Sequence, residues 1–272
     1  MSDPNAQALF RLRVRYRKQG RLAYLGHLEV IHTIERIVRR AGLPYAVTQG
    51  FSPHMRVAFT SALPVGTSST CEWYDLFLTE LVPAPEAFER LLAASPADLA
   101  PDLCAYIDVK APALTAQITR NGYRVELEPR EGYTLDADEI ARMLDDIKAA
   151  GQIEYERGRK HKTLDVAAML LSVTTWAQEG GTVVLTLDTH ASNEGSLRPE
   201  ILLAALDRKI VGGEYGASPI VSTGIQDLIS IERYAVCRIS QHIEGENATL
   251  LPVLEVSRIP SRPVTASSVP YL

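Results

Sequence analysis

FRLRVRYRK, residues 10–18, alternates apolar and basic side chains over nine positions. A period of two is typical of a β-strand, in which successive side chains point to opposite faces. The apolar set is Phe10, Leu12, Val14 and Tyr16, and the basic set is Arg11, Arg13, Arg15 and Arg17. The stretch therefore predicts a strand with one face on the core and a row of guanidinium groups on the other.

The residues that follow predict an amphipathic helix. In HLEVIHTIERIVRRAG, residues 27–42, apolar side chains recur at helical spacing, and Gly42 is a typical stop. The polar side carries Glu29, His32, Arg36, Arg39 and Arg40. His27 lies at the start of this helix, on the flank of its apolar face.

The order of predicted elements indicates the fold class. After the first strand and helix come strands over 56–66 and 69–80, a helix over 83–95 and a strand over 102–111. This is the split βαβ order of a ferredoxin-like fold, and residues 118–239 repeat it less clearly. We therefore expect an α+β chain of two tandem ferredoxin-like units with antiparallel sheets. The expected units span 8–113 and 114–240, and a flexible Ser/Pro-rich tail is expected over 241–272.

The charge is unevenly distributed along the 272 residues. Residues 10–56 hold ten Lys/Arg and two acids, which gives +8, whereas the net charge of the whole chain is −5. The remainder therefore carries −13. A basic pole on an acidic chain favours a local anion-binding face, although pairing with acidic residues or ordinary solvation is an equal alternative on composition alone.

Several classes of function have no sequence signal. There is no phosphate-binding or dinucleotide-binding glycine motif, no zinc-protease motif, no nucleophile elbow and no iron–sulfur cysteine cluster. The three cysteines are far apart, so neither a disulfide framework nor a metal site is expected. Without a signal peptide or an apolar run of membrane length, the cytoplasm is the expected location. We expect no cofactor in this chain and no membrane partner.

Two further segments could contact phosphate groups. The loop TQGFSPHMRVAF, residues 48–59, offers Phe51 as a stacking ring and His54 and Arg56 as donors. The cluster RGRKHK, residues 157–162, is either a solvated hairpin tip or a second phosphate contact. The complete predicted RNA-binding set is Arg11, Arg13, Arg15, Arg17, His32, Arg36, Arg39, Arg40, Phe51, His54, Arg56, Arg159, Lys160 and Lys162.

Few side chains are suited to acid–base chemistry. His27 and His54 are the candidates, because histidine titrates near neutral pH, but a structural role is the commoner one for a lone histidine. Glu72 and Asp75 lie three positions apart on a predicted strand. They should face opposite sides of the sheet and not form a catalytic carboxylate pair.

Six motifs follow one another between Phe10 and about Glu80: FRLRVRYRKQG, GHLE, ERIVRRAGLP, TQGFSPHMRVAF, ALPVG and CEWYD. In this combination the chain resembles a bacterial family, the radical-SAM-linked domain of unknown function. GSLRPEILLAAL and RGRKHKTLD, which includes Asp165, are weaker features of the same resemblance. The resemblance implies a radical SAM partner that binds cobalamin, fused to this domain or encoded beside it, and RNA as the substrate.

The sequence therefore favours an RNA-binding accessory module that works with a radical SAM enzyme in RNA modification or processing and is not catalytic on its own. Two alternatives stay open. One is a metal-free endoribonuclease that uses His27 or His54, since paired ferredoxin-like units resemble the architecture of CRISPR repeat-processing endoribonucleases. The other is a protein-interaction module whose basic face docks on an acidic partner.

Overall fold

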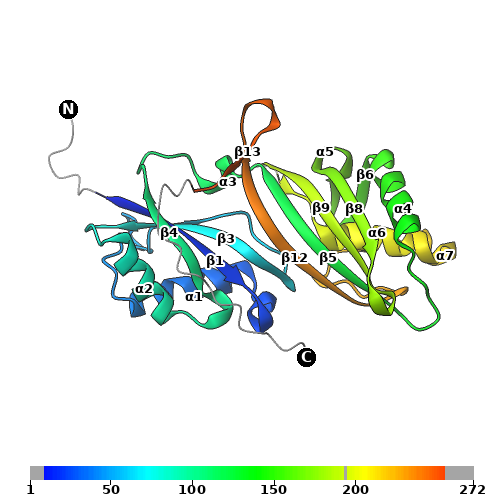
Figure 1. Ribbon diagram of the computed structural model, residues 1–272, viewed down its shortest axis with the longest axis horizontal. Helices are drawn as coiled ribbons and strands as arrows, with labels where there is room; N and C mark the ends of the chain where they lie inside the picture. Colours follow the sequence, from blue (N-terminus) through cyan, green and yellow to red (C-terminus); the bar gives the residue numbers. More distant parts are fainter. Residues whose placement is uncertain (1–8, 193–194, 255–272) are drawn as a thin grey trace.

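The computed structural model describes residues 9–192 and 195–254 (Figure 1). The first half contains the strands β1 (Phe10–Lys18), β2 (Val57–Phe59), β3 (Thr67–Leu78) and β4 (Pro101–Ile107), and the helices η1 (Gly20–Tyr24), α1 (His27–Arg40), α2 (Ala84–Ala94) and η2 (Ala97–Leu99). The second half contains the strands β5 (Arg120–Pro129), β6 (Gln152–Arg157), β7 (Lys160–Asp165), β8 (Leu170–Ala177), β9 (Val183–Ser192), β10 (Gly195–Ser196), β11 (Ile220–Val221), β12 (Ile231–Glu244) and β13 (Leu250–Pro252). Its helices are α3 (Leu114–Gln117), α4 (Ala137–Ala150), α5 (Val166–Met169), η3 (Glu179–Gly181), α6 (Pro199–Val211), α7 (Gly213–Gly216) and η4 (Glu246–Ala248).

One large mixed sheet runs through both halves, in the order β10-β9-β5-β12-β3-β1-β4. The halves meet where β12 pairs in parallel with β3, joining Val236–Arg238 to Thr67–Ser69. This corrects the expectation of two separate antiparallel sheets. The reason is the length of β3: β2 pairs only with its second half, so its first half is an open edge that β12 completes.

The first core confirms the predicted alternation along β1. Leu12, Val14 and Tyr16 are buried against α1 and α2, which both cover this face of the sheet. At the start of α1, the side chain of Glu29 accepts a hydrogen bond from the backbone N–H of Gly26 at 2.7 Å. This contact satisfies one of the free donors at the helix start. The helix ends before Gly42, which adopts a left-handed φ of 62°.

The opposite face of β1 is covered by a short roof, which we define as residues 108–118 together with Val253 and Leu254. Trp73, Leu114, Ile118, Val253 and Leu254 form a small buried cluster there. Residues 241–254, expected as the beginning of the tail, therefore belong to the fold, because β12 and β13 continue through them. Residues 255–272, the rest of the expected tail, lie outside the described residues. The proposed boundary at 113/114 stays a prediction.

In the second half, the core lies between the sheet and the helices α4 and α6. The stretch LDVAAMLLSVTTWAQ, for which the periodicity was ambiguous, divides into the short helix α5 and the strand β8. Residues 152–165 form the hairpin β6–β7, which joins β11 in a small separate sheet.

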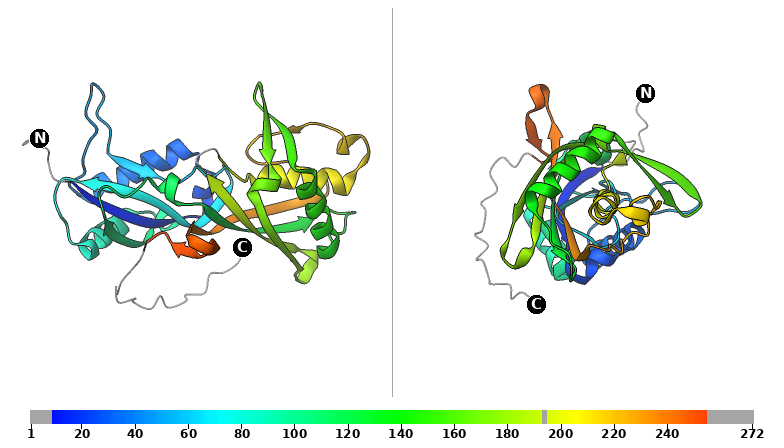
Figure 2. Two further views of the ribbon diagram at one scale, coloured as in Figure 1. Left: turned by 90° about the horizontal axis from the view of Figure 1, so that it is seen from above. Right: turned by 90° about the vertical axis from the view of Figure 1, so that its right-hand side faces the viewer.

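Two hairpins project from the same side of the molecule (Figure 2, left). The first, which we call the 47–55 loop, is closed by a bridge between Val47 and Met55. The second is the β6–β7 hairpin. In this view α1 lies between the two hairpins, so the exposed side of α1 and both hairpins lie along the same edge of the molecule.

Candidate nucleic-acid interface and adjoining polar site

The first two arginines of β1 are buried, which corrects the prediction of an open row of guanidinium groups. Arg11 and Arg13 are 4% and 2% exposed, and both bind Asp75, which is fully buried on β3. Their ion pairs with this carboxylate measure 2.7 Å and 2.8 Å. These two arginines are buried because the roof covers this face of β1. Both hold the roof in place by donating to its backbone carbonyl groups: Arg11 donates to Val109, Ala111 and Pro112, and Arg13 donates to Val253.

The last two arginines of β1 lie nearer to solvent. Arg15 is partly exposed, pairs with Asp102 at 2.8 Å and lies over the ring of Trp73. Arg17 is exposed. Neither arginine can form one surface with the polar side of α1. The helix packs on the apolar face of β1, whereas these two side chains point to the other face of the strand. The structure therefore separates the predicted strand face from the predicted helix face.

The polar side of α1 remains a basic surface. His32, Arg36, Arg39 and Arg40 are all exposed. Their contacts are weak or local: Arg36 donates to the hydroxyl of Thr33, Arg39 lies 3.6 Å from Glu35, and Arg40 binds the carbonyl of Ala94. An exposed i,i+4 ion pair such as Arg39–Glu35 contributes only a few tenths of a kcal/mol to stability. Phosphate groups can therefore compete for these guanidinium groups.

The 47–55 loop presents a fully exposed aromatic ring. Phe51 is at its tip, and two hydrogen bonds of the His54 backbone hold the base: its carbonyl accepts from Thr48 N–H, and its N–H donates to Thr48 Oγ1 at 3.0 Å. The His54 ring lies 3.4 Å from the Ser52 hydroxyl. Arg56 packs on Phe77, which also contacts Arg11, so Arg56 belongs to the arginine side of β1.

The β6–β7 hairpin is the second projection, and it is the one that carries basic residues. Arg159, Lys160 and Lys162 are exposed, and residues 157–162 contain four Lys/Arg and no acid. Next to the turn of the hairpin, His161 lies 3.9 Å from Glu156. The predicted set therefore contributes two projecting hairpins and one helix face to this side of the molecule, whereas Arg11, Arg13, Arg15, Arg17 and Arg56 lie elsewhere. We call these two hairpins and the helix face the basic side.

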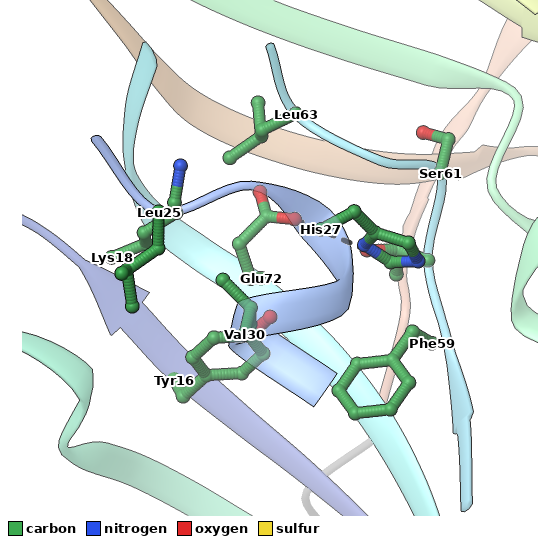
Figure 3. Close-up of a pocket in the computed structure, with 10 residues that line it drawn as sticks. Tyr16, Lys18, Leu25, His27, Val30, Phe59, Ser61, Leu63 and Glu72 are labelled. Atoms are coloured by element: carbon green, nitrogen blue, oxygen red, sulfur yellow. Dashed lines mark hydrogen bonds between the residues drawn. The ribbon is translucent and has the colours of Figure 1, made fainter. Parts of the chain in front are cut away.

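Next to the start of α1 lies a small polar cavity (Figure 3). Lys18, His27 and Glu72 line it, with the carboxylate of Glu72 between the other two in this view. Its volume is about 10 Å³, which is room for roughly one water molecule. Burial lowers the pKa of His27, so the neutral ring is favoured at neutral pH.

Lys18 is 2% exposed and donates to the carbonyls of Ala23 and Thr67, at 2.6 Å and 3.2 Å. Burial lowers its pKa to about 8. The sequence contained a signal for this position, because Lys18 continues the apolar series of β1 at a period of two and so belongs to the core face. The predicted set of binding residues nevertheless omitted it.

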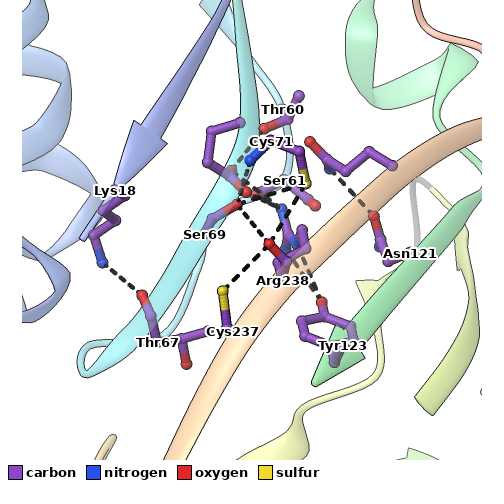
Figure 4. A network of polar contacts seen from close by, with 12 residues as sticks. Lys18, Thr60, Ser61, Thr67, Ser69, Cys71, Asn121, Tyr123, Cys237 and Arg238 are labelled. Atoms are coloured by element: carbon purple, nitrogen blue, oxygen red, sulfur yellow. Dashed lines mark hydrogen bonds and ion pairs between the residues drawn. The ribbon is translucent and has the colours of Figure 1, made fainter. Parts of the chain in front are cut away.

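Through Arg238, Glu72 also takes part in a polar network that joins the two halves. Figure 4 shows this network around Arg238 and Tyr123. Arg238 of β12 is fully buried, pairs with Glu72 at 3.1 Å and donates to the hydroxyl of Tyr123 on β5. Glu72 and Asp75 do face opposite sides of β3, as expected from their spacing. The role of Arg238 had no sequence signal, because its partners are 166 and 115 positions away.

Residues 11–199 match the model of a protein family described as "Uncharacterized protein conserved in bacteria (DUF2344)". The match covers more than half of the chain. The chain belongs to this family. No curated protein matches the DUF2344 chain, and the radical SAM linkage implied by the resemblance is not part of the family description.

Among solved structures, this DUF2344 protein is similar to chains in two complexes. One is a Cbf5–Nop10–Gar1 complex, with a TM-score of 0.45, 9% identity, and coverage of 86% of this chain and 50% of that chain. The other is the archaeal box H/ACA sRNP Nop10–Cbf5 complex, with a TM-score of 0.40, 7% identity, and coverage of 84% and 46%. This chain thus spans about half the length of the chains it matches.

The described residues contain neither a cluster of metal ligands nor a helix that could span a membrane. Residues 9–192 and 195–254 contain no group of three or more His, Cys, Asp or Glu arranged to hold a metal ion. Within the same ranges, no helix has the length and hydrophobicity needed to cross a membrane.

Proposed function

We propose that this DUF2344 protein is an RNA-binding accessory module whose contact surface is the basic side. The observation that carries the proposal is the placement of exposed cations on α1 and on the β6–β7 hairpin, with the exposed ring of Phe51 on the 47–55 loop at the same side of the molecule. Arginine and lysine side chains free of strong ion pairs bind phosphate oxygens, and an exposed ring such as Phe51 stacks on unpaired bases.

The proposal is tested by RNA binding over a salt series, with two pairs of charge reversals. Arg36→Glu/Arg39→Glu alters α1 and Arg159→Glu/Lys160→Glu alters the β6–β7 hairpin. We expect each pair to weaken binding of a short single-stranded RNA by roughly tenfold or more, and to reduce the salt slope by about two, for all RNA sequences alike.

The matched control is Lys110→Glu/Arg142→Glu, which makes the same charge change at exposed positions on the roof and on α4. We expect this control to lower affinity much less than either test pair. The proposal is contradicted if the wild-type protein does not bind RNA or binds it independently of salt. It is also contradicted if the control variant binds RNA as weakly as the test variants.

We further propose that the module presents RNA to a radical SAM enzyme. The support is the run of six motifs between Phe10 and about Glu80 that resembles the radical-SAM-linked family. Co-purification of the two proteins after nuclease treatment separates the partner's contribution from shared RNA. The nuclease alternative has less support, because His27 lines a cavity with room for roughly one water and His54 lies within an exposed loop.

We also propose that each half is a ferredoxin-like unit. In the first half the strand order is β4-β1-β3 with β2 beside β3, and in the second it is β12-β5-β9 with β8 beside β9, all in antiparallel pairs. The hairpin β6–β7 and α5 then form an insertion in the second unit. This arrangement supports two units that share one sheet through β3 and β12.

A further inference from the structure

A second cavity lies where the two halves meet, with a volume of about 270 Å³. We call it the junction pocket. One wall comes from Tyr24 of η1 and from Val65–Thr67, and the other from residues 224–236 and Glu200 of α6. Because both halves supply walls, the pocket exists only in the assembled fold.

Glu200 is a lining residue of this pocket whose carboxylate has an unsatisfied hydrogen-bond acceptor. It is 3% exposed, and its Oε1 accepts from Arg198 Nε at 2.9 Å. Its Oε2 is buried and makes no hydrogen bond to the described residues. Burial raises the pKa of this carboxyl group. A buried acceptor without a donor is costly, so a ligand that donates to Oε2 gains more than it would at an exposed carboxylate.

The charges around the pocket disfavour an anion. Three residues of the lining, Glu200, Asp227 and Glu232, are acidic, and one, Arg233, is basic and lies 2.6 Å from Glu128. Arg130 is similarly shared between Asp227 and Glu232. A phosphate group would meet repulsion here, whereas a neutral group with N–H donors would be accepted.

The remaining lining suits a flat ring. Tyr24 is 61% exposed, and Ile225 is 46% exposed close to Gly66, which has a left-handed φ of 83°. The ring of Tyr234 lies deeper, with its hydroxyl accepting from the N–H of Gln226 at 2.7 Å. Exposed aromatic and aliphatic side chains over a buried acceptor are the features that hold nucleobases by stacking and edge contacts.

The junction pocket also lies between the elements of the basic side. Tyr24 ends η1, three residues before α1 begins. On the other wall, β11 pairs with Tyr155 and Glu156 of the β6–β7 hairpin, and the pocket lining starts three residues after it, at Gly224. A strand of RNA bound to α1 and to this hairpin would therefore pass close to the walls of the pocket.

We infer that the junction pocket takes one unstacked, amino-bearing nucleobase (adenine, cytosine or guanine) from the bound RNA, with Glu200 accepting from its amino group. This inference rests on the proposed RNA binding. Uracil is disfavoured, because it has no amino group and its two carbonyl oxygens would flank the carboxylate. The pocket volume suits one ring system and leaves the sugar and phosphate outside.

The test uses the full chain and 12-nucleotide RNAs: U12, and the same RNA with one central A, C or G. We expect at least one substituted RNA to bind roughly tenfold tighter than U12. Replacement of the preferred base by its analogue without the amino group (purine for adenine, 2-pyrimidinone for cytosine, inosine for guanine) should remove the gain. Glu200→Gln should abolish the discrimination and leave U12 binding unchanged, because phosphate contacts lie outside the pocket.

A second variant and a control keep the outcome independent of folding. Tyr24→Ala changes an exposed side chain and should lower the gain severalfold, whereas Glu86→Gln on α2 should leave it intact. Equal binding of all four RNAs overturns the pocket inference while the proposed function stands. Absence of binding to every RNA refutes the proposed function itself. Free nucleosides that bind as tightly as the oligonucleotides overturn the claim that RNA delivers the base.

Discussion

Lys18 is held in its charged form at a cost, because its ammonium group is buried and its two hydrogen-bond partners are backbone carbonyls. The carboxylate of Glu72, which lines the same cavity, is already bound to Arg238 and to Thr60. The lysine therefore has a lowered pKa of about 8, with burial as its main cause. Stability should depend on this one group in the alkaline range.

The direction of this pH dependence follows from the number of protons that the unfolded and folded states bind. Between pH 8 and about 10.5 the unfolded chain still binds the Lys18 proton, while the folded chain has released it, so the free energy of unfolding rises with pH in this window. We expect Lys18→Met to lose this rise, which amounts to about 3 kcal/mol. Urea unfolding from pH 7 to 10.5 measures it, with Lys110→Met as the exposed-lysine control. Parallel profiles for wild type and Lys18→Met contradict the expectation.

At the scale of elements, β1 shows what periodicity can and cannot predict. Alternation assigned Leu12, Val14 and Tyr16 to the core correctly, since a strand has only two faces. It could not show that the other face is also covered, because the roof comes from residues about 100 and 240 positions away. The exposed ring at the tip of the 47–55 loop, by contrast, follows from local turn residues around Gly50 and Pro53.

Phe51 offers an element-scale prediction that separates binding from folding. Its side chain is fully exposed, so Phe51→Ala should leave the melting temperature unchanged. Loss of one base-stacking contact costs about 1–3 kcal/mol, so RNA affinity should fall at least fivefold. Filter binding and a thermal melt on the same preparation measure both quantities. Phe51→Tyr is the matched control and should retain affinity; an alanine variant that binds like wild type excludes stacking at this position.

At the scale of the whole molecule, the two halves are joined by buried charge as well as by strand pairing. Arg238 on β12 reaches Glu72 on β3, and Arg13 on β1 reaches the carbonyl of Val253. Element order in the sequence indicated an α+β chain of two similar halves. The shared sheet and these long-range partners could not be predicted, because single residues give no signal for contacts that depend on tertiary placement.

Val253 and Leu254 provide the whole-molecule test, since they close the roof over Arg13 from the far end of the described chain. A chain ending at Pro252 should be less stable than one ending at Leu254 by roughly 3 kcal/mol or more, because two buried side chains and the acceptor for a buried guanidinium are lost. Val253→Ala/Leu254→Ala in the longer chain keeps that carbonyl and should lose less. Urea unfolding of the three proteins ranks them. Equal stability of the two truncated chains would show that the roof does not depend on these residues, and a double alanine variant as unstable as the shorter chain would assign the whole effect to apolar burial.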